Sequence, residues 1–185
     1  MKNTGILLGF LPLIVYGVLA GSSAESVVFA LGAATVVTVL VGLSDLRKGR
    51  ILSWATLVMF GSLLVAVGVL GLSGILPFMG ILIYAALAAV TFGSILAKTP
   101  FTLQYAREMV DRTLWENPAF IRVNVLMTGF WGGIFAIDLA LSYLTFAYPY
   151  SVGWITSPLT YLFLIAGILF TIGYPGYIQK KHTAR

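Results

Sequence analysis

Six long apolar segments constrain the fold of this chain more than any other feature of its sequence. A membrane-spanning helix needs about 20 consecutive apolar residues, and backbone surrounded by lipid must satisfy its own hydrogen bonds. The strands of a membrane barrel would instead form shorter segments, of about ten residues, with alternating polarity. We therefore expect an all-helical, polytopic membrane protein with six transmembrane helices. The expected spans are approximately residues 5–21, 26–44, 51–72, 75–97, 119–146 and 156–178.

The composition supports a membrane protein and excludes several kinds of site. The chain is 59% hydrophobic and only 9% charged, whereas a soluble domain carries about 25% charged residues. It has no cysteine and one histidine, His182, which excludes disulfides, thiol catalysis and bis-histidine haem. The sequence also contains no HxxxH, GxSxG or acidic metal-binding pair. We therefore expect no enzyme, no catalytic residue, no metal site and no cofactor.

The basic residues predict the topology. Short loops rich in Lys and Arg remain in the cytoplasm, and all basic residues of this chain fall on one side of the predicted spans, whereas the opposite loops carry only Glu25. An even number of spans with both termini cytoplasmic fits this distribution, in the cytoplasmic (inner) membrane of a prokaryote. The net charge of +5 then reflects orientation rather than a nucleic-acid partner. The basic residues are Lys2, Arg47, Lys48, Arg50, Lys98, Arg107, Arg112, Arg122, Lys180, Lys181 and Arg185.

The first segment leaves two alternatives open. It has the outline of a signal peptide, with Lys2, an apolar core and VLA before GSSA. We favour a retained helix, because the charge distribution requires an even number of spans. Phe10 and Tyr16 also align with Phe78 and Tyr84 of the fourth segment, a similarity that chance produces readily in apolar sequence and that leaves an inverted repeat undecided. We expect one domain over residues 1–185.

A polar connector over residues 98–122 holds seven of the 17 charged side chains. Pro100 is expected to end the fourth helix. Residues 102–110 are compatible with a short helix at the cytoplasmic interface, with Phe101, Tyr105 and Met109 forming an apolar edge among the lipid headgroups. Thr113 to Glu116 has the spacing of a capping box.

The fifth helix is expected to begin near Pro118, because Asn117 offers an N-cap and proline suits the first helical position. About 29 residues make it longer than a hydrocarbon core of roughly 30 Å. Its polar and aromatic residues fall on one face. They are Asn124, Thr128, Trp131, Phe135, Asp138 and Ser142. A neighbouring stripe of small residues predicts close approach of another helix, which would place the fifth helix at the centre of the bundle. That stripe is Gly129, Gly133, Ala136 and Ala140.

Polar stripes on three other segments predict an interior seam, densest at the cytoplasmic end. Their hydroxyl groups are expected to form interhelical hydrogen bonds, each contributing about 0.6 kcal/mol. The stripes are Thr35, Thr38, Gly42 and Asp45 in the second segment, Tyr84, Thr91, Ser94 and Lys98 in the fourth, and Thr160, Gly167, Thr171 and Tyr174 in the sixth. At the other membrane surface, Phe146, Tyr148, Tyr150 and Trp154 resemble an interfacial aromatic belt.

Asp138 is the only charged residue expected inside the membrane, because Arg122 lies at the start of the fifth helix, which is expected to begin in the cytoplasm. A carboxylate inside the membrane costs about 2.5 to 3.5 kcal/mol and usually faces a partner or a cavity, yet no basic residue is expected at that depth to pair with it. We expect a protonated, hydrogen-bonded side chain near Ser142 or Tyr143 in a structural role. A proton or cation relay, and exposure near the outer interface, are the alternatives.

The connector and the start of the fifth helix supply candidate ligand-binding residues. The ordinary interpretation is a solvated surface whose basic residues contact anionic lipid. The alternative is a lining for an anionic group at the membrane surface, because arginine binds phosphate or carboxylate bidentately and tryptophan lies well beside a headgroup. The lipid- or ligand-binding candidates are Gln104, Tyr105, Arg107, Trp115, Arg122, Asn124 and Trp131.

The same residues carry a resemblance to a known family. A polar connector with Trp115, then Arg122-x-Asn124, Trp131 and a deeper polar residue, Asp138, resembles the intracellular septation protein A family of bacterial inner-membrane proteins. The FLPLI run and the DLRKGR loop are similar too. The family typically has Asn at the position of Asp138, and its connector differs from TLQYARE. The resemblance implies a role in envelope maintenance and division, without established catalytic residues.

We therefore expect a non-enzymatic inner-membrane protein of envelope maintenance, division or membrane-complex scaffolding. A small proton-coupled transporter or channel that uses Asp138 is the alternative, and a lipid-handling enzyme has the least support. The expected partners are anionic lipid headgroups at the cytoplasmic face. Association with other membrane proteins or with further copies of the chain stays open, and no nucleic-acid partner is expected.

Overall fold

The computed structural model describes residues 4–183 and is helical throughout its ordered elements, with 88% helix and no strand in the part described. This confirms the all-helical prediction. Two basic residues on which the predicted topology depends, Lys2 and Arg185, lie outside the described residues. The side chains of Lys180, Lys181 and His182 lie outside the described side chains.

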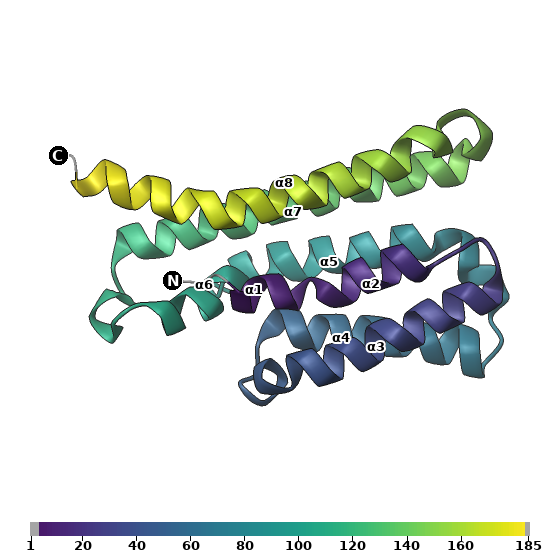
Figure 1. Cartoon of the computed structure of the whole chain (residues 1–185), viewed down its shortest axis with the longest axis horizontal. Coiled ribbons are helices and arrows are strands. Elements are labelled where there is room, and N and C mark those ends of the chain that lie inside the picture. Colours follow the sequence, from purple (N-terminus) through teal and green to yellow (C-terminus); the bar gives the residue numbers. More distant parts are fainter. Residues whose placement is uncertain (1–3, 184–185) are drawn as a thin grey trace. The chain divides into compact units, whose positions relative to one another are not determined.

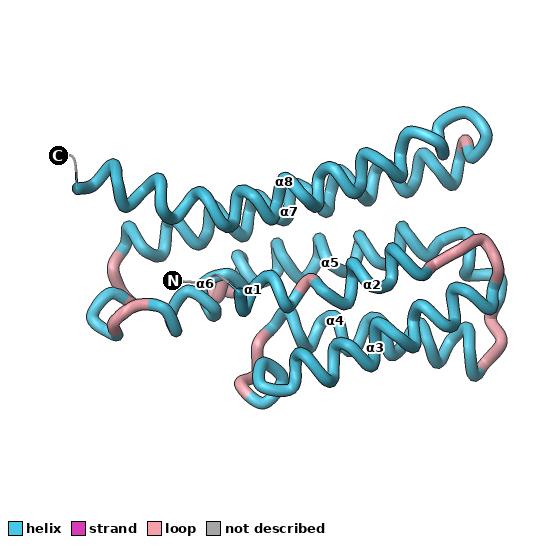
Figure 2. The backbone as a smooth tube through the Cα atoms, viewed as in Figure 1, coloured by secondary structure: helices cyan, strands magenta, loops and turns pink. Residues whose placement is uncertain are grey.

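Eight α-helices follow one another along residues 4–183, joined by turns (Figures 1 and 2). A π-helical turn (Val65–Val69) extends the fourth helix, and 3-10 turns occupy Ser73–Phe78, Arg107–Met109 and Arg112–Leu114. The helices are α1 (Thr4–Gly9), α2 (Leu11–Leu19), α3 (Ala24–Arg47), α4 (Ile51–Leu64), α5 (Met79–Leu96), α6 (Phe101–Ala106), α7 (Pro118–Ala147) and α8 (Pro149–Thr183).

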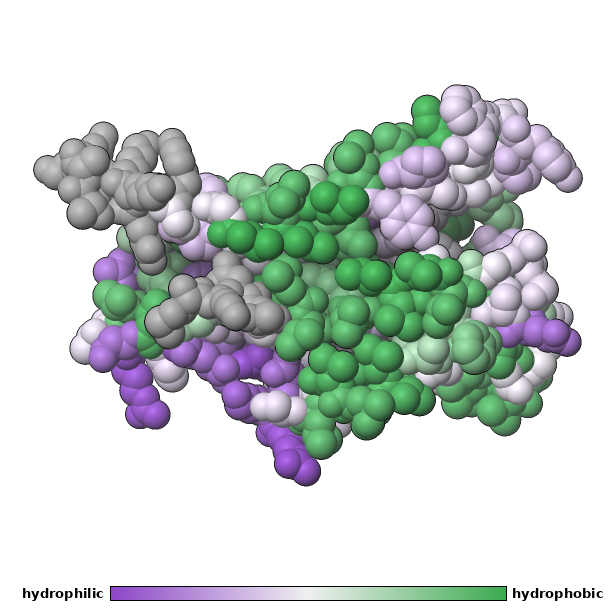
Figure 3. All heavy atoms as spheres, viewed as in Figure 1, coloured by the Kyte–Doolittle hydropathy of each residue, from purple (hydrophilic) through white to green (hydrophobic). Residues whose placement is uncertain are grey.

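Five helical stretches are long and apolar enough to cross a membrane, so the chain has the features of a multi-pass membrane protein. The first apolar segment is a shorter helix that is interrupted at Phe10, and its membrane crossing stays a prediction. Figure 3 shows hydrophobic atoms along the middle of the helices and hydrophilic atoms toward their ends. The five stretches are Ala24–Arg47, Ile51–Val69, Ser73–Leu96, Pro118–Ala147 and Pro149–Gly176.

The chain divides into two compact units, and their boundary falls within α5. In the unit Thr4–Val90, α3 packs against α2 on one side and α4 on another. Phe10, Leu31 and Phe60 are fully buried there, and the rings of Tyr16 and Phe60 lie 5.6 Å apart between centroids. Burial of these large side chains holds the short α2 against the longer helices. The expectation of a single domain stays a prediction.

The basic DLRKGR sequence forms a fixed turn between α3 and α4. Gly49 adopts a φ of +68°, which a residue without Cβ tolerates well. The turn lets the guanidinium group of Arg50 reach the carboxylate of Asp45, with 2.8 Å between Nη1 and Oδ1. The indole Nε1 of Trp54 donates to the carbonyl oxygen of Leu46 at 3.0 Å, which fixes α4 against the end of α3.

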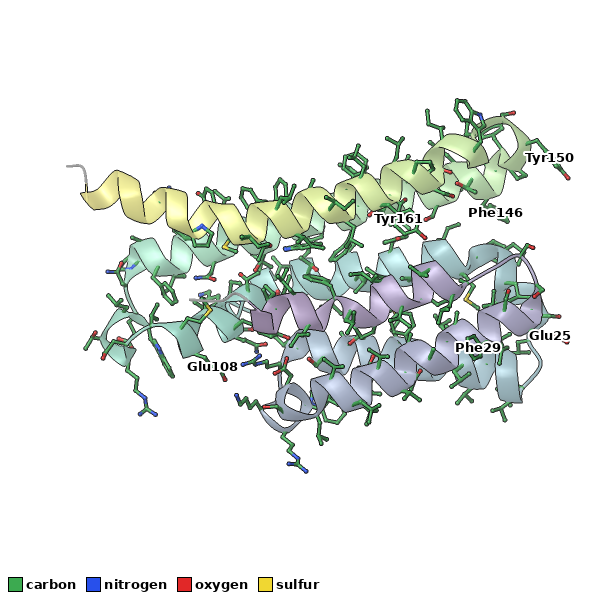
Figure 4. All side chains as sticks on the ribbon, in the orientation of Figure 1. Glu25, Phe29, Glu108, Phe146, Tyr150 and Tyr161 are labelled. Atoms are coloured by element: carbon green, nitrogen blue, oxygen red, sulfur yellow. The ribbon has the colours of Figure 1, made fainter. Side chains whose placement is uncertain are left out.

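The second unit contains the antiparallel helices α7 and α8, which lie side by side, and α6, which contacts α7 (Figure 1). Only Tyr148 separates α7 from α8, so the predicted loop before residue 156 is instead the first part of α8. Phe146 and Tyr150 lie at this end of the helix pair, whereas Glu108 lies on the connector that follows α6 (Figure 4). Tyr150 and Trp154 are strongly exposed, as a belt at the membrane surface requires.

The predicted start of α7 is confirmed. The helix begins at Pro118 and has 30 residues, and the side chain of Asn117 accepts a hydrogen bond from the backbone N–H of Ala119 at 2.9 Å. The capping-box prediction for Thr113 to Glu116 is wrong. Asp111 instead caps the preceding 3-10 turn, because its Oδ1 accepts from the backbone N–H of Thr113 at 2.9 Å.

The connector helix differs from its prediction in length and in orientation. α6 ends at Ala106 rather than near residue 110. Phe101 and Tyr105 do not form an outward apolar edge, because both side chains are buried inside the protein. Only Met109, which lies beyond the helix, is exposed. α6 therefore packs as part of the protein core and does not present its aromatic residues to the headgroups.

Candidate functional site

The polar face predicted for α7 is confirmed as a buried face. Its polar and aromatic residues Asn124, Thr128, Trp131, Phe135 and Asp138 are all buried. Burial of a polar group is costly unless the group forms hydrogen bonds. The partners of these side chains therefore decide what the face can do.

At the N-terminal end of this face, a hydroxyl network joins α6 to α7. The Thr102 hydroxyl donates to the carbonyl oxygen of Asn124 at 2.8 Å. Its oxygen lies 2.8 Å from the hydroxyl oxygen of Thr128. Because the single proton of Thr102 is already donated, the Thr128 hydroxyl is the donor in this second bond. The backbone N–H of Thr102 in turn donates to Thr128 Oγ1 at 3.4 Å.

Asn124 completes this network on its own helix. Its Nδ2 donates to the carbonyl oxygen of Phe120 at 2.9 Å. The first turn of α6 is also tied to the end of α5, because the backbone N–H of Phe101 donates to Ser94 Oγ at 3.3 Å. The polar groups of this region therefore fix α6 to its neighbouring helices.

Trp131 lies in the middle of the contact between α7 and α8 and is 0% exposed. Its Nε1 donates to the Thr171 hydroxyl at 3.0 Å. Its six-membered ring fills the space above Gly167, where a Cβ atom would lie 2.7 Å from Cη2. A glycine is required at this close approach, so Trp131 and Gly167 together set the separation of the two helices.

The close approaches do not follow the predicted stripe of small residues. Ala136 and Ala140 are exposed, and a Cβ atom on Gly133 would meet nothing within 4 Å. The close contacts occur instead at Gly132, where a Cβ atom would lie 2.9 Å from the ring of Phe92, and at Gly167 on α8. The predicted central position of α7 in the whole bundle stays a prediction.

Asp138 is 2% exposed and faces α8. The side chain of Thr160 interacts with its carboxyl group, whereas Oδ1 is buried with no hydrogen-bond partner among the described residues. The expectation of a neighbour at Ser142 or Tyr143 is wrong, since the partner comes from the facing helix. Exposure near the outer interface is excluded by the burial of the side chain.

Most other buried hydroxyl groups bond to their own helix rather than across to another. Thr35 donates to the carbonyl oxygen of Leu31, and Thr38 to that of Ala34, both at 2.8 Å. Such bonds to the preceding turn satisfy a hydroxyl without a neighbour. The expectation of general interhelical hydrogen bonding is therefore wrong for these positions. Thr56 and Ser62 behave in the same way. Ser94 donates to its own helix and also accepts the hydrogen bond from Phe101.

Two arginines and a tryptophan come together in the connector. The guanidinium carbon of Arg107 lies 5.3 Å from the centroid of the Trp115 ring, and that of Arg112 lies 5.6 Å from it. Trp115 Nε1 donates to the carbonyl oxygen of Arg107 at 3.0 Å. These distances are within the range of cation–π attraction. We call these three residues the connector cluster.

The structure thus separates the predicted ligand-binding residues. Arg107 and Trp115 are together, and Arg112, which we did not predict as a ligand-binding residue, joins them. Its position five residues after Arg107 within the polar connector is the only sequence signal for it. Trp131 lies in the separate contact with α8, and Arg122 is exposed on the second turn of α7. Gln104 and Tyr105 belong to α6, where Tyr105 is buried and Gln104 is half-buried.

The exposed Asp111 beside the cluster has a lowered pKa. The first cause is the hydrogen bond that its carboxylate accepts from the backbone N–H of Thr113, and the second is the Thr113 side chain. A hydrogen bond to the charged form favours ionisation. Asp111 therefore stays ionised and holds the turn that presents Arg112.

No family model, curated protein or solved structure matches this chain. Among the described residues, no group of three His, Asp or Glu side chains is placed to hold a metal ion.

Proposed function

We propose that this chain is a non-enzymatic scaffold protein of the prokaryotic cytoplasmic membrane that serves envelope maintenance or division. The supporting observation is that polar groups on the buried face of α7 are used internally. Thr102 and Thr128 fix α6 to α7, and Trp131 and Thr171 fix α8 to α7. A transport site needs groups that bind and release a substrate, whereas these groups have permanent partners in a packed interface. They therefore favour a rigid structural unit.

The sequence resemblance supports the envelope role within this proposal. Trp115, Arg122, Asn124 and Trp131 carry the resemblance to the septation protein A family. Two of them, Trp115 and Trp131, hold neighbouring parts of the chain through their indole N–H groups. A structural role of this kind explains why a resembling family would need tryptophan at both positions.

Deletion of the gene in the source cell tests the scaffold proposal. We expect altered cell length or greater sensitivity to detergent, restored by the wild-type chain and by Gly173→Val, whose position is open. Gly167→Val, which would force α7 and α8 apart, should not restore the phenotype. Normal envelope and division in the deletion strain would contradict the scaffold proposal.

The topology of the proposal is six spans with both termini cytoplasmic. Because the chain has no cysteine, single cysteines can be introduced at Ser22, Lys48, Thr113 and Tyr150 without a background signal. An impermeant maleimide should label Ser22→Cys and Tyr150→Cys in intact cells, and Lys48→Cys and Thr113→Cys only after permeabilisation. Labelling of Ser22→Cys and Lys48→Cys from the same side would rule out this topology.

The burial of Asp138 favours a second candidate, a small proton-coupled transporter or channel. Its Oδ1 is buried without a partner, and a carboxyl group in that state can accept and release a proton. Proteoliposomes with an internal pH-sensitive dye decide between the candidates. Transport predicts proton flux that Asp138→Asn abolishes, whereas the scaffold predicts no flux above empty vesicles and a variant that folds normally.

A further inference from the structure

The connector cluster has an arrangement that the internal packing of the protein does not explain. The indole of Trp115 is held in place because its Nε1–H donates to the backbone carbonyl of Arg107. The guanidinium group of that same residue lies over the ring at 5.3 Å, and Arg112 approaches the ring at 5.6 Å. Two positive charges are therefore gathered around one fixed aromatic side chain.

These charges are not neutralised by the described part of the chain. Neither Arg107 nor Arg112 forms an ion pair there, and Nε of Arg107 is buried without a hydrogen-bond partner. Two acidic residues adjoin these arginines in sequence. Asp111 uses a carboxylate oxygen to cap the turn through Thr113, and Glu108 is exposed and forms no ion pair with either arginine. An unpaired polar atom that is hidden from solvent costs free energy unless a ligand satisfies it.

We infer that Arg107, Arg112 and Trp115 form a binding site for a phosphate group at the membrane surface. The forked guanidinium group matches the oxygens of a phosphate or phosphodiester and donates two hydrogen bonds to it. Indole rings prefer the depth of the lipid headgroups, and anionic phospholipids gather at the cytoplasmic surface where the connector is predicted to lie. The phosphate belongs either to an anionic phospholipid or to a phosphate compound in solution. This site is independent of the proposed scaffold role.

Lysine variants distinguish a specific phosphate site from nonspecific electrostatic attraction of anionic lipid to positive charge. Arg107→Lys and Arg112→Lys keep the positive charge but lose the fork, and Arg122→Lys is the matched control because Arg122 is exposed outside the cluster. Full-length protein in a maltoside detergent, whose headgroup contains no phosphate, is titrated with short-chain phosphatidylglycerol or phosphatidylcholine, and bound lipid is counted by native mass spectrometry. A second titration adds inorganic phosphate as a competitor. Circular dichroism checks that each variant keeps its helices.

Arg107→Lys and Arg112→Lys should each weaken phosphatidylglycerol binding roughly tenfold, the loss expected for one charge-assisted hydrogen bond. Arg122→Lys should bind like the wild type. If inorganic phosphate displaces phosphatidylglycerol from the wild type but not from the two cluster variants, the site binds soluble phosphate. If phosphatidylglycerol binds and inorganic phosphate does not displace it, the site binds a phospholipid. Equal binding by all three variants would overturn the inference, whereas equal binding of phosphatidylcholine that both cluster variants weaken would show that the site recognises the phosphodiester itself.

Discussion

The contact between Gly167 and Trp131 allows a sharp test of how α7 and α8 pack, through Gly167→Ala. The added Cβ atom would lie 2.7 Å from Cη2 and 2.8 Å from Cζ3 of Trp131, and 2.9 Å from Cδ1 of Ile134. These distances are too short for carbon atoms, so a side chain or a helix has to move. Trp131 cannot turn aside easily, because it is fully buried and its Nε1 donates to Thr171.

The expected loss of stability follows from three contributions. Overpacking in a well-packed core costs about 1–3 kcal/mol, and loss of the Trp131–Thr171 hydrogen bond adds about 1 kcal/mol. Replacing glycine by alanine within a helix offsets up to about 1 kcal/mol. The net destabilisation is therefore roughly 1–3 kcal/mol. For a chain of this length, each kcal/mol lowers the melting temperature by about 2–4 °C.

Thermal unfolding of the purified protein in detergent, followed by tryptophan fluorescence, measures this loss. Gly173→Ala is the matched control on the same helix, since a Cβ atom there would meet nothing within 4 Å, and it should melt at or above the wild-type temperature. Adding Trp131→Phe removes the clashing ring atoms and should recover part of the stability lost in Gly167→Ala. If Gly167→Ala melts together with Gly173→Ala, the packing described for α7 and α8 is wrong.

Three further substitutions test the connector. Lys98 has a φ of +58°, so Lys98→Gly should raise stability by about 1 kcal/mol in thermal melts, and a decrease would contradict strain at this position. Thr102→Val removes hydrogen bonds to the Asn124 carbonyl and the Thr128 hydroxyl and should cost about 1–3 kcal/mol in the same melts, whereas an unchanged melting temperature would show that the network contributes nothing. Because the pKa of Asp111 is lowered in the folded protein, the ionised side chain adds stability above the ordinary pKa of 3.8, and this stability is lost as the pH falls through the folded-state pKa. The melting temperatures of wild type and Asp111→Asn should therefore converge in acid. A difference between them that does not change with pH would refute this.

Local signals in the sequence were enough to place α7 and its polar face. Asn117 followed by Pro118 is a strong helix start, because both residues act within the first turn and need no distant partner. The shared face of Asn124, Thr128 and Asp138 followed from their spacing, since side chains three or four residues apart lie on one side of a helix. Its burial followed from their polarity, because polar side chains in a membrane span face the interior of the bundle. The predicted start of α7 and its predicted polar face are therefore both confirmed.

Predictions that depended on a partner were less successful. Phe101 and Tyr105 have the spacing of an interfacial helix, but the spacing does not reveal whether lipid or protein covers that side. Thr102, between them, bonds to α7 and directs the helix inward. The capping-box prediction at Thr113 failed for a different reason: the Thr113 N–H, which the Glu116 side chain would have accepted, donates instead to the Asp111 carboxylate at the start of a 3-10 turn.

The small-residue stripe shows the same difficulty. Gly129, Gly133, Ala136 and Ala140 fit a pattern of close helix contact, yet a pattern on one helix does not say where the partner supplies a large side chain. Gly167 is required because Trp131 lies opposite it, and Gly132 because Phe92 does. The complementary residue on the other helix decides which glycine matters.

The register of α7 against α8 shows which types of polar residue indicate, from sequence, a partner on a neighbouring helix. A Thr hydroxyl in a helix always has the carbonyl of the preceding turn available, so it needs no partner from another helix. An indole N–H or a carboxyl group has no such local partner, and both polar residues of this kind on the buried α7 face contact α8: Trp131 bonds to Thr171, and Asp138 interacts with Thr160. Along α7 these positions are two turns apart, and Thr145, two turns further, lies 2.7 Å from Thr156 between hydroxyl oxygens. The residue numbers of the partners on α8 decrease as those on α7 increase, as an antiparallel pair requires. A one-turn slip of α8 would separate every one of these pairs and remove Gly167 from the Trp131 ring, so the polar contacts and the glycine fix one register together.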